Sequence, residues 1–196
     1  MELIYPSLQS VPMLPRPSVN LTGNAISQEG ERLPIVEPSG EVIACAARNY
    51  VHSGSLLLHP VVHLHVLDRM GRLYLQKRAA SKDLWPLRWD TSVGGHIEFG
   101  ETVMPALYRE ADEELGLKYF NPIPLGSHVY ENGSERELVC IFACIGTFSP
   151  VPNPAEIEQG KWWEFKEIED NLGKSLFTPN FESEFMQVKD SLLSLL

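Results

Sequence analysis

The sequence predicts an α/β fold in which a mixed sheet carries helices on both of its faces. Extended segments and amphipathic helices follow one another in the order strand–strand–helix–strand–strand–strand–helix. The apolar run of residues 138–145 is typical of a strand that is buried on both faces. At 196 residues the chain has the size of one domain, which is large enough to bury a core without stabilisation by disulfide bonds or structural metal ions.

The first part of the chain is expected to be an extension that precedes the folded domain. Residues 1–33 contain four prolines and two glycines, so we interpret them as an N-terminal extension and place the domain at residues 34–196. Residues 33–47 predict a short hairpin with its turn at Pro38-Ser39-Gly40. Residues 48–58 are less regular and include His52.

Residues 60–67 alternate between two faces and predict a strand, which pairs with residues 72–78 as a central hairpin. One face takes Val62, Leu64 and Val66, and the other takes Val61, His63, His65 and Leu67. We interpret His63 and His65 as core or rim residues, and a role as ligands is the alternative.

The loop of residues 82–90 leads into a glycine-rich bend at Gly94-Gly95. Its two tryptophans, Trp85 and Trp89, predict either a wall of a substrate site or packing against the sheet edge. The following helix spans residues 102–115 and ends at Gly116, a residue that often terminates helices. Its predicted apolar stripe consists of Met104, Tyr108, Ala111 and Leu115.

The second half of the chain predicts two further strands, residues 122–130 and 136–148, around a turn at Asn132-Gly133. Cys140 and Cys144 fall inside the second strand and are expected in the core. Residues 161–165 predict another short strand, and residues 167–172 predict a helical turn. A terminal helix over residues 181–196 has an apolar stripe of Phe181, Phe185, Val188, Leu192 and Leu195.

The composition limits the classes of partner. The net charge of −10, from 26 acidic and 16 basic residues, disfavours binding to nucleic acid polymers or anionic membranes. An anionic substrate would therefore need a local basic patch or a metal. Three cysteines form no disulfide framework, no apolar run is long enough to span a membrane, and the N-terminus does not resemble a signal peptide. We expect a cytoplasmic protein, and a homodimer is left open.

Three carboxylates share one face of the helix of residues 102–115, namely Glu110, Glu113 and Glu114. No lysine or arginine occupies a compensating position on that face, and Arg109 lies one step off it. A hard divalent cation with oxygen ligands, such as Mg²⁺, would offset the repulsion. A solvated acidic face is the alternative, but the spacing of these residues from Gly95, Glu101, Arg109 and Gly116 favours the metal site.

This spacing, G-x5-E-x7-R-E-A-x-E-E-x-G-L, resembles the Nudix box and fills each of its fixed positions. The resemblance implies a Nudix fold, an α-β-α sandwich with a mixed central sheet. It also implies a metal-dependent hydrolase that cleaves small-molecule diphosphates with Mg²⁺ or Mn²⁺. Glu110, Glu113 and Glu114, with Gly94, would form the metal site, one glutamate would act as base, and Arg109 and Glu101 would orient the cluster. Arg72, Lys77 and Arg78 are candidate phosphate-binding cations, or else solvent-facing charges of the strand.

A second resemblance, over about residues 38–185, is to type I isopentenyl-diphosphate isomerases, which share the Nudix fold. The similar segments include Val51-His52, Leu57-Leu58-His59, Trp85-Pro86 and Glu135-Arg136-Glu137. The resemblance implies a second, transition-metal site formed by His52, His59, His96, Glu135 and Glu137. The residue types agree with this, because Glu135 and Glu137 share one face of a strand and imidazole suits Zn, Mn or Fe.

One position departs from the isomerase pattern. The isomerases need a cysteine two residues before the matching histidine, and this chain has Gly94 there, which offers no side chain for proton transfer. Together with the complete box, the glycine favours hydrolysis, in which water attacks a phosphorus atom of a diphosphate. The alternatives are an isomerase-like enzyme that uses a different acid and a non-catalytic sensor of diphosphates or nucleotides.

Overall fold

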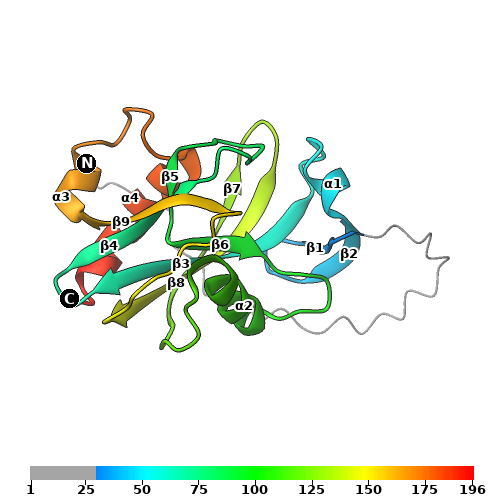
Figure 1. Ribbon diagram of the computed structural model, residues 1–196. Helices are drawn as coiled ribbons and strands as arrows, with labels where there is room; N and C mark the ends of the chain where they lie inside the picture. Colours follow the sequence, from blue (N-terminus) through cyan, green and yellow to red (C-terminus); the bar gives the residue numbers. More distant parts are fainter. Residues whose placement is uncertain (1–29) are drawn as a thin grey trace, which may run out of the picture.

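The computed structural model describes residues 30–196, so nearly all of the extension predicted for residues 1–33 lies outside the described residues. Its centre is a seven-stranded mixed sheet in which β5, β4, β3, β8 and β7 lie in this order, while β6 pairs with β3 and β9 with β4 (Figure 1). The strands are β3 (Leu58–Asp68), β4 (Arg72–Arg78), β5 (Trp89–Asp90), β6 (Val93–His96), β7 (Ile123–Glu131), β8 (Arg136–Gly146) and β9 (Ile157–Glu164). The predicted fold class is confirmed.

Strand β3 is the centre of the sheet and is buried along its whole length. One edge pairs in parallel with all of β8, from Leu58 opposite Arg136 to Asp68 opposite Gly146. The other edge is shared, because residues 61–64 pair with β6 and residues 66–67 pair with β4. The predicted hairpin of β3 and β4 therefore exists, but its ladder is short, and β4 and β6 separate from each other beyond it.

Helix α2 (Val103–Leu115) covers one face of the sheet, where it packs on Val62, Leu64 and Val66. It ends as predicted at Gly116, which adopts the left-handed conformation with φ of 65°. The predicted apolar stripe is partly wrong, because Met104 is 39% exposed. The residues that face the sheet are rotated relative to the prediction and comprise Val103, Ala106, Leu107, Ala111, Glu114 and Leu115.

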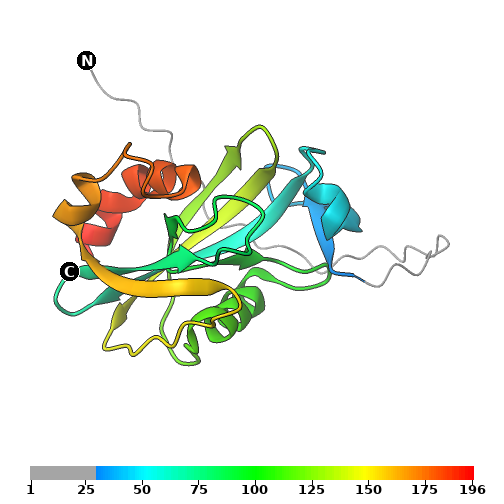
Figure 2. The ribbon, with the colours of Figure 1, turned by 45° about the horizontal axis from the view of Figure 1, so that its top comes forward.

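Helix α4 (Pro179–Leu193) covers the opposite face, as Figure 2 shows. The hydroxyl of Thr178 caps its first turn by accepting the Phe181 N–H. Its buried apolar residues agree with the predicted stripe and are Phe181, Phe185, Val188 and Leu192. The short helix α3 (Phe165–Glu169) precedes it, where a helical turn was expected slightly later in the chain.

The predicted N-terminal hairpin consists of β1 (Arg32–Val36) and β2 (Val42–Ala47), and it forms a two-stranded sheet separate from the main one. Helix α1 (Arg48–Val51) follows it and ends at His52. The backbone N–H of Phe99 donates to the carbonyl of Arg32, which holds the hairpin against the glycine-rich bend. Within residues 30–196, no helix has both the length and the apolar character needed to cross a membrane.

Candidate active site and metal centre

A cleft of about 330 Å³ opens where β4 and β6 separate, and its volume is typical of small-molecule sites. Strands β3, β4 and β6 contribute His63, Gln76 and Gly94 to its lining. Helix α2 contributes Arg109, Glu110 and Glu114, and the loop of residues 82–90 forms part of the rim. The glycine-rich bend, the box helix and the tryptophan loop predicted from the sequence therefore meet around one cavity.

Arg109 fastens the glycine-rich bend to α2. Its Nε and Nη2 donate to the two carboxylate oxygens of Glu101 at 3.1 and 2.8 Å, and Nη2 also donates to the carbonyl of His96 at 2.9 Å. Its Nη1 donates to Glu110 at 2.6 Å. The expectation that no cation compensates the acidic face is therefore wrong, because the long arginine side chain reaches it from the neighbouring position. Glu101 and Arg109 together fix where Glu110 lies.

Glu114 is buried at the inner end of the cleft. Its Oε2 accepts the backbone N–H of Gly94 at 3.1 Å and the side-chain amide of Gln76 at 3.0 Å. Burial and the charge of Glu110 raise the pKa of Glu114 to about 8. Burial also raises the pKa of Glu110, although Arg109 opposes this. The backbone N–H of Gly94 thus orients the carboxylate of Glu114, and the predicted place of Gly94 in the metal site stays a prediction.

The two glycines of the bend differ in what surrounds them. A Cβ atom at Gly95 would lie 2.0 Å from Cδ of Glu110, so only glycine lets this carboxylate approach the bend. Glu113 lies apart from the other two glutamates, because its side chain is 60% exposed and contacts Arg109 only at 3.5 Å. Of the three predicted carboxylates, two line the cleft and one lies outside it.

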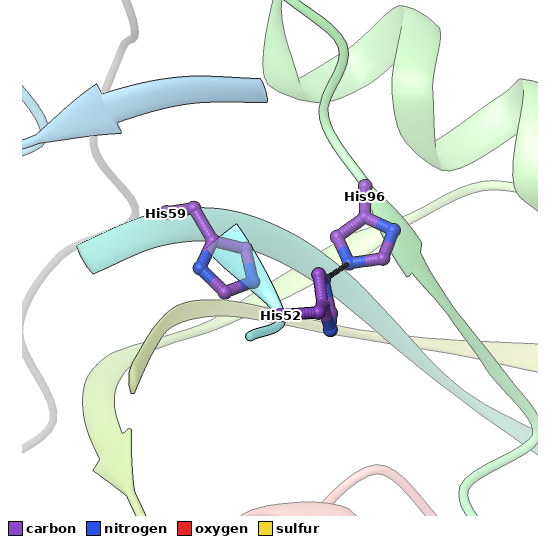
Figure 3. Close-up of side chains that lie close together, drawn as sticks. All are labelled: His52, His59 and His96. Atoms are coloured by element: carbon purple, nitrogen blue, oxygen red, sulfur yellow. Dashed lines mark hydrogen bonds between the residues drawn. The ribbon is translucent and has the colours of Figure 1, made fainter. Parts of the chain in front are cut away.

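Three histidines from three segments form a compact cluster (Figure 3), and two of them, His52 and His96, line the cleft. His52 follows α1, His59 lies on β3 and His96 ends β6, and one nitrogen of each lies within 4.8 Å of the others. His52 Nε2 and His96 Nε2 are 3.0 Å apart. The three rings therefore lie close enough together to form the ligand set of one metal ion.

The protonation of His59 suits a ligand. Its Nδ1 lies 3.0 Å from the carbonyl of Leu57, so Nδ1 carries the hydrogen and donates it. Its Nε2 then has a free lone pair, and this atom is buried without a hydrogen-bond partner in residues 30–196. Burial lowers the pKa of His59, and burial with the neighbouring histidines lowers that of His96 further. Both rings are therefore neutral, the form that binds metals.

The two predicted glutamates lie beside this cluster, Glu135 in the turn before β8 and Glu137 on β8, and the three-histidine group itself contains neither of them. Glu135 Oε2 lies 3.3 Å from His52 Nδ1. Burial raises the pKa of Glu135, but the hydrogen bond and charge of His52 outweigh this and lower it. Glu137 faces His59 in the β3–β8 ladder, and burial with the charge of Glu135 raises its pKa to about 7. The buried lone pair and two carboxylates fit a transition metal well.

The candidate substrate residues divide into two groups. Trp85 and Arg78 line the cleft. The ring of Trp85 is 39% exposed, and the guanidinium of Arg88 lies over it at 4.8 Å. Arg78 donates to Asp90 at 3.1 Å and to the carbonyl of Leu84.

The structure places the other three candidates outside the cleft lining. Arg72 pairs with Asp68 at 2.6 Å at the far end of β4. Lys77 precedes Arg78 on β4, so the alternation of the strand directs it to the other face. Trp89 is only 7% exposed and packs edge-on against Trp163, with ring centroids 5.1 Å apart. The sheet-edge alternative is thus correct for Trp89.

Two residues of the cleft had no signal in the sequence that pointed to a site, namely Gln76, which binds Glu114, and Lys82, which pairs with Glu156. His63, interpreted from the sequence as a core or rim residue, faces the cavity from β3. Their positions depend on the strand order and on loop packing. The alternating pattern predicted the correct face of β3 for His63. That face includes residues of the core as well as residues of the cleft, so the pattern alone does not distinguish the two.

Comparison with known proteins gives consistent results. The sequence model of the NUDIX domain matches residues 57–181. An isopentenyl-diphosphate Delta-isomerase of Brevibacterium linens is 31% identical over 81% of this chain and 92% of its own length. A Nudix hydrolase of Yersinia pestis is 30% identical over 76% of this chain and 81% of its own. The structure of DR0079 from Deinococcus radiodurans matches with a TM-score of 0.70 and 25% identity, over 80% of this chain and 98% of that one.

Proposed function

Since this chain belongs to the Nudix family, we propose that it is a metal-dependent hydrolase that cleaves a diphosphate linkage in a small organic molecule. The observation that supports this most is the pair of buried carboxylates, Glu110 and Glu114, side by side in the cleft. Burial raises the pKa of both. Arg109 balances this pair only in part, because the same guanidinium also binds Glu101, and a divalent metal would supply further positive charge.

Glu110, Glu113 and Glu114 are the proposed ligands of Mg²⁺ or Mn²⁺, with Gly94 orienting Glu114. When bound, the cation neutralises phosphate oxygens and lowers the pKa of water towards about 7. Glu110 or Glu114 takes the proton of the attacking water, because these two line the cleft. The water oxygen bonds to phosphorus, and the anhydride bond on its other side breaks. Arg109 holds Glu110 in place throughout.

The histidine cluster is proposed to hold a second, transition-metal ion through His52, His59 and His96, with Glu135 and Glu137 beside it. Its support is chemical, since neutral rings with a buried free lone pair are suited to such a metal. At the same end of the cleft, this ion would add positive charge near the substrate. Trp85 and Arg78 are the proposed contacts to the remainder of the substrate.

Isomerisation is the second candidate function, because the relative from Brevibacterium linens is named as an isomerase. The cleft of this chain lacks a thiol, since Cys140 and Cys144 are buried in the core and Cys45 lies on β2 outside the lining. Gly94 supplies no acid in their place. We therefore expect no conversion of isopentenyl diphosphate into its dimethylallyl isomer. Conversion well above that of a Glu110→Ala variant would reverse the order of the two functions.

The function is tested by offering a panel of nucleoside-diphosphate-linked compounds and isoprenoid diphosphates with Mg²⁺ or Mn²⁺ in ¹⁸O-labelled water. The expected result is release of phosphate products with one ¹⁸O atom on phosphorus. Glu110→Gln should abolish the release. Asp112→Asn, on the same helix but paired with Lys118 outside the cleft, should leave it unchanged. Metal and substrate binding without turnover in any member of the panel would favour a sensor instead.

A further inference from the structure

A buried carboxylate lies between β3 and α4, behind the wall of the cleft. Glu184 is fully buried, and each of its oxygens binds a different histidine of β3. Oε2 accepts from His63 Nδ1 at 2.8 Å, and Oε1 accepts from His65 Nε2 at 2.7 Å. An ionised carboxylate in such a place is stable only with a positive partner. One of the two histidines must therefore carry a charge.

The hydrogen-bonding pattern identifies His63 as the charged ring. His65 is fully buried, and its Nδ1 has no partner within residues 30–196. A buried N–H without an acceptor is costly, so this Nδ1 is a bare lone pair and His65 is neutral. His63 then balances Glu184 and has a hydrogen on both nitrogens. Burial lowers the pKa of His63, but the charge and hydrogen bond of Glu184 outweigh this and raise it to about 9.

The second nitrogen of His63 faces the cleft. His63 lines the cavity and lies opposite Gly94 in the ladder of β3 and β6. A Cβ atom at Gly94 would lie 3.3 Å from Cδ2 and 3.4 Å from Nε2 of His63. The glycine therefore leaves this edge of the ring open to the cavity. His65 lies farther along β3 on the same face and does not line the cleft.

The other basic side chains of the cleft lining are already paired with carboxylates that line it too or lie next to it. Arg48 contacts Glu31, Arg78 binds Asp90, Lys82 binds Glu156, and Arg109 binds Glu101 and Glu110. His63 differs, because its partner Glu184 lies on the side of the ring away from the cleft. The Nε2–H, which faces the cleft, is therefore free to donate to a ligand. Three further titratable groups act on His63 from neighbouring strands, namely Glu137 of β8, Asp90 of β5 and the neutral His128 of β7.

We propose that His63 is a phosphate-binding residue of the cleft, whose Nε2–H donates a hydrogen bond to a phosphate oxygen of the diphosphate while Glu184 positions the ring. This inference rests on the proposed function, since it assumes that a diphosphate enters the cleft. It adds a contact from β3 that neither the Nudix box nor the histidine cluster contains. His63 belongs to the face of the sheet that α4 covers, since its Nδ1 binds Glu184 of that helix.

The test uses methylene diphosphonate, which cannot be hydrolysed, with Mg²⁺ and the full chain. Calorimetry should give a dissociation constant that is about tenfold to a hundredfold higher for His63→Gln, as expected for loss of a charged hydrogen bond. The matched control is His65→Gln, which loses a bond to the same carboxylate but no group in the cleft. Its dissociation constant should stay within about threefold of wild type, and Mn²⁺ binding should be unchanged in both.

A second measurement uses the unaltered protein and so does not depend on how the variants fold. In ¹⁵N-labelled protein, the probe should shift the Nε2 signal of His63 and leave the signals of His65 unchanged. Equal binding by His63→Gln, or an equal loss in His65→Gln, would overturn the proposal while hydrolysis by wild type preserved the proposed function. Failure of wild type to bind the diphosphonate with Mg²⁺ would overturn both.

Discussion

Replacing Gly95 by alanine should displace Glu110, one of the proposed metal ligands, without disturbing the fold. The new Cβ would lie 2.0 to 2.4 Å from the three terminal atoms of Glu110. Ordinary contact distances are nearer to 3.4 Å, so the carboxylate must retreat by about 1.4 Å and give up its 2.6 Å bond to Arg109. A displacement of about 1 Å at a reacting group costs on the order of 100-fold in rate.

The fold should tolerate this change, because the displaced atoms are the far end of a flexible side chain. Gly95 does not have a positive φ, so alanine can adopt its backbone conformation. We expect the free energy of unfolding to change by less than about 1 kcal/mol, and the affinity for Mn²⁺ to fall about tenfold to a hundredfold. Gly133→Ala is the control, since an added Cβ there would meet no atom within 4 Å and Gly133 does not line the cleft.

Calorimetric titration with Mn²⁺ and urea denaturation measure the two quantities separately. A double-mutant cycle adds a sharper criterion, because Gly95→Ala should have no further effect in a Glu110→Ala background. Mn²⁺ binding by Gly95→Ala within threefold of wild type would refute the role of Glu110 as a ligand. A further loss in the double variant would show that the glycine acts through another group.

Three other predictions follow from the buried ionisable groups. Glu114→Gln should weaken Mn²⁺ binding yet unfold at higher urea than wild type in EDTA at pH 9. Folding raises the pKa of Glu114 from 4.5 to about 8, so wild type loses stability as the pH rises from 4.5 to 8 and the loss is complete at pH 9. Lower stability of the variant at pH 9 would contradict this. His59→Ala should contain about one equivalent less transition metal than wild type by elemental analysis, and equal metal content in the two proteins would refute the site. Wild type should keep the metal below pH 6.5, because burial lowers the pKa of His59. Because its pKa is raised to about 9, His63 stabilises the fold fully below pH 6.5 and loses this effect as the pH rises to 9. Urea denaturation should therefore give wild type a free energy of unfolding up to roughly 3 kcal/mol above that of His63→Gln at pH 6, and a much smaller excess at pH 9.5. A difference that is the same at both pH values would contradict this.

The parts of the fold that depend on local pattern were predictable. The end of α2 at Gly116 needs a left-handed residue, and glycine is the usual choice. The run from Leu138 to Cys144 is apolar on both faces because β8 has a helix on each side of it, and Cys140 and Cys144 are indeed fully buried. The turn at Asn132-Gly133 likewise falls between β7 and β8.

The failures concern residues whose environment depends on distant pairing. Trp89 was offered as a substrate contact, but β5 pairs with β4 and brings it against Trp163. The division of one edge of β3 between two strands could not be predicted, because it depends on where β6 pairs. The reach of Arg109 across the helix depends on side-chain length rather than spacing. Cytoplasmic location and the role of residues 1–33 remain predictions.

The position of His52 connects the proposed metal centre to the stability of the N-terminal hairpin. This residue follows the N-terminal hairpin and α1, whereas His59 and His96 belong to the central sheet, and the hairpin forms its own two-stranded sheet. A cation shared by all three would act as a cross-link between two separately hydrogen-bonded units and would close the chain between residues 52 and 96. A ligand that binds only the folded form adds about 4 kcal/mol to the free energy of unfolding at a thousandfold excess over Kd. A chelator would remove this contribution, and the hairpin, which shares no ladder with the central sheet, would then open before the sheet itself unfolds.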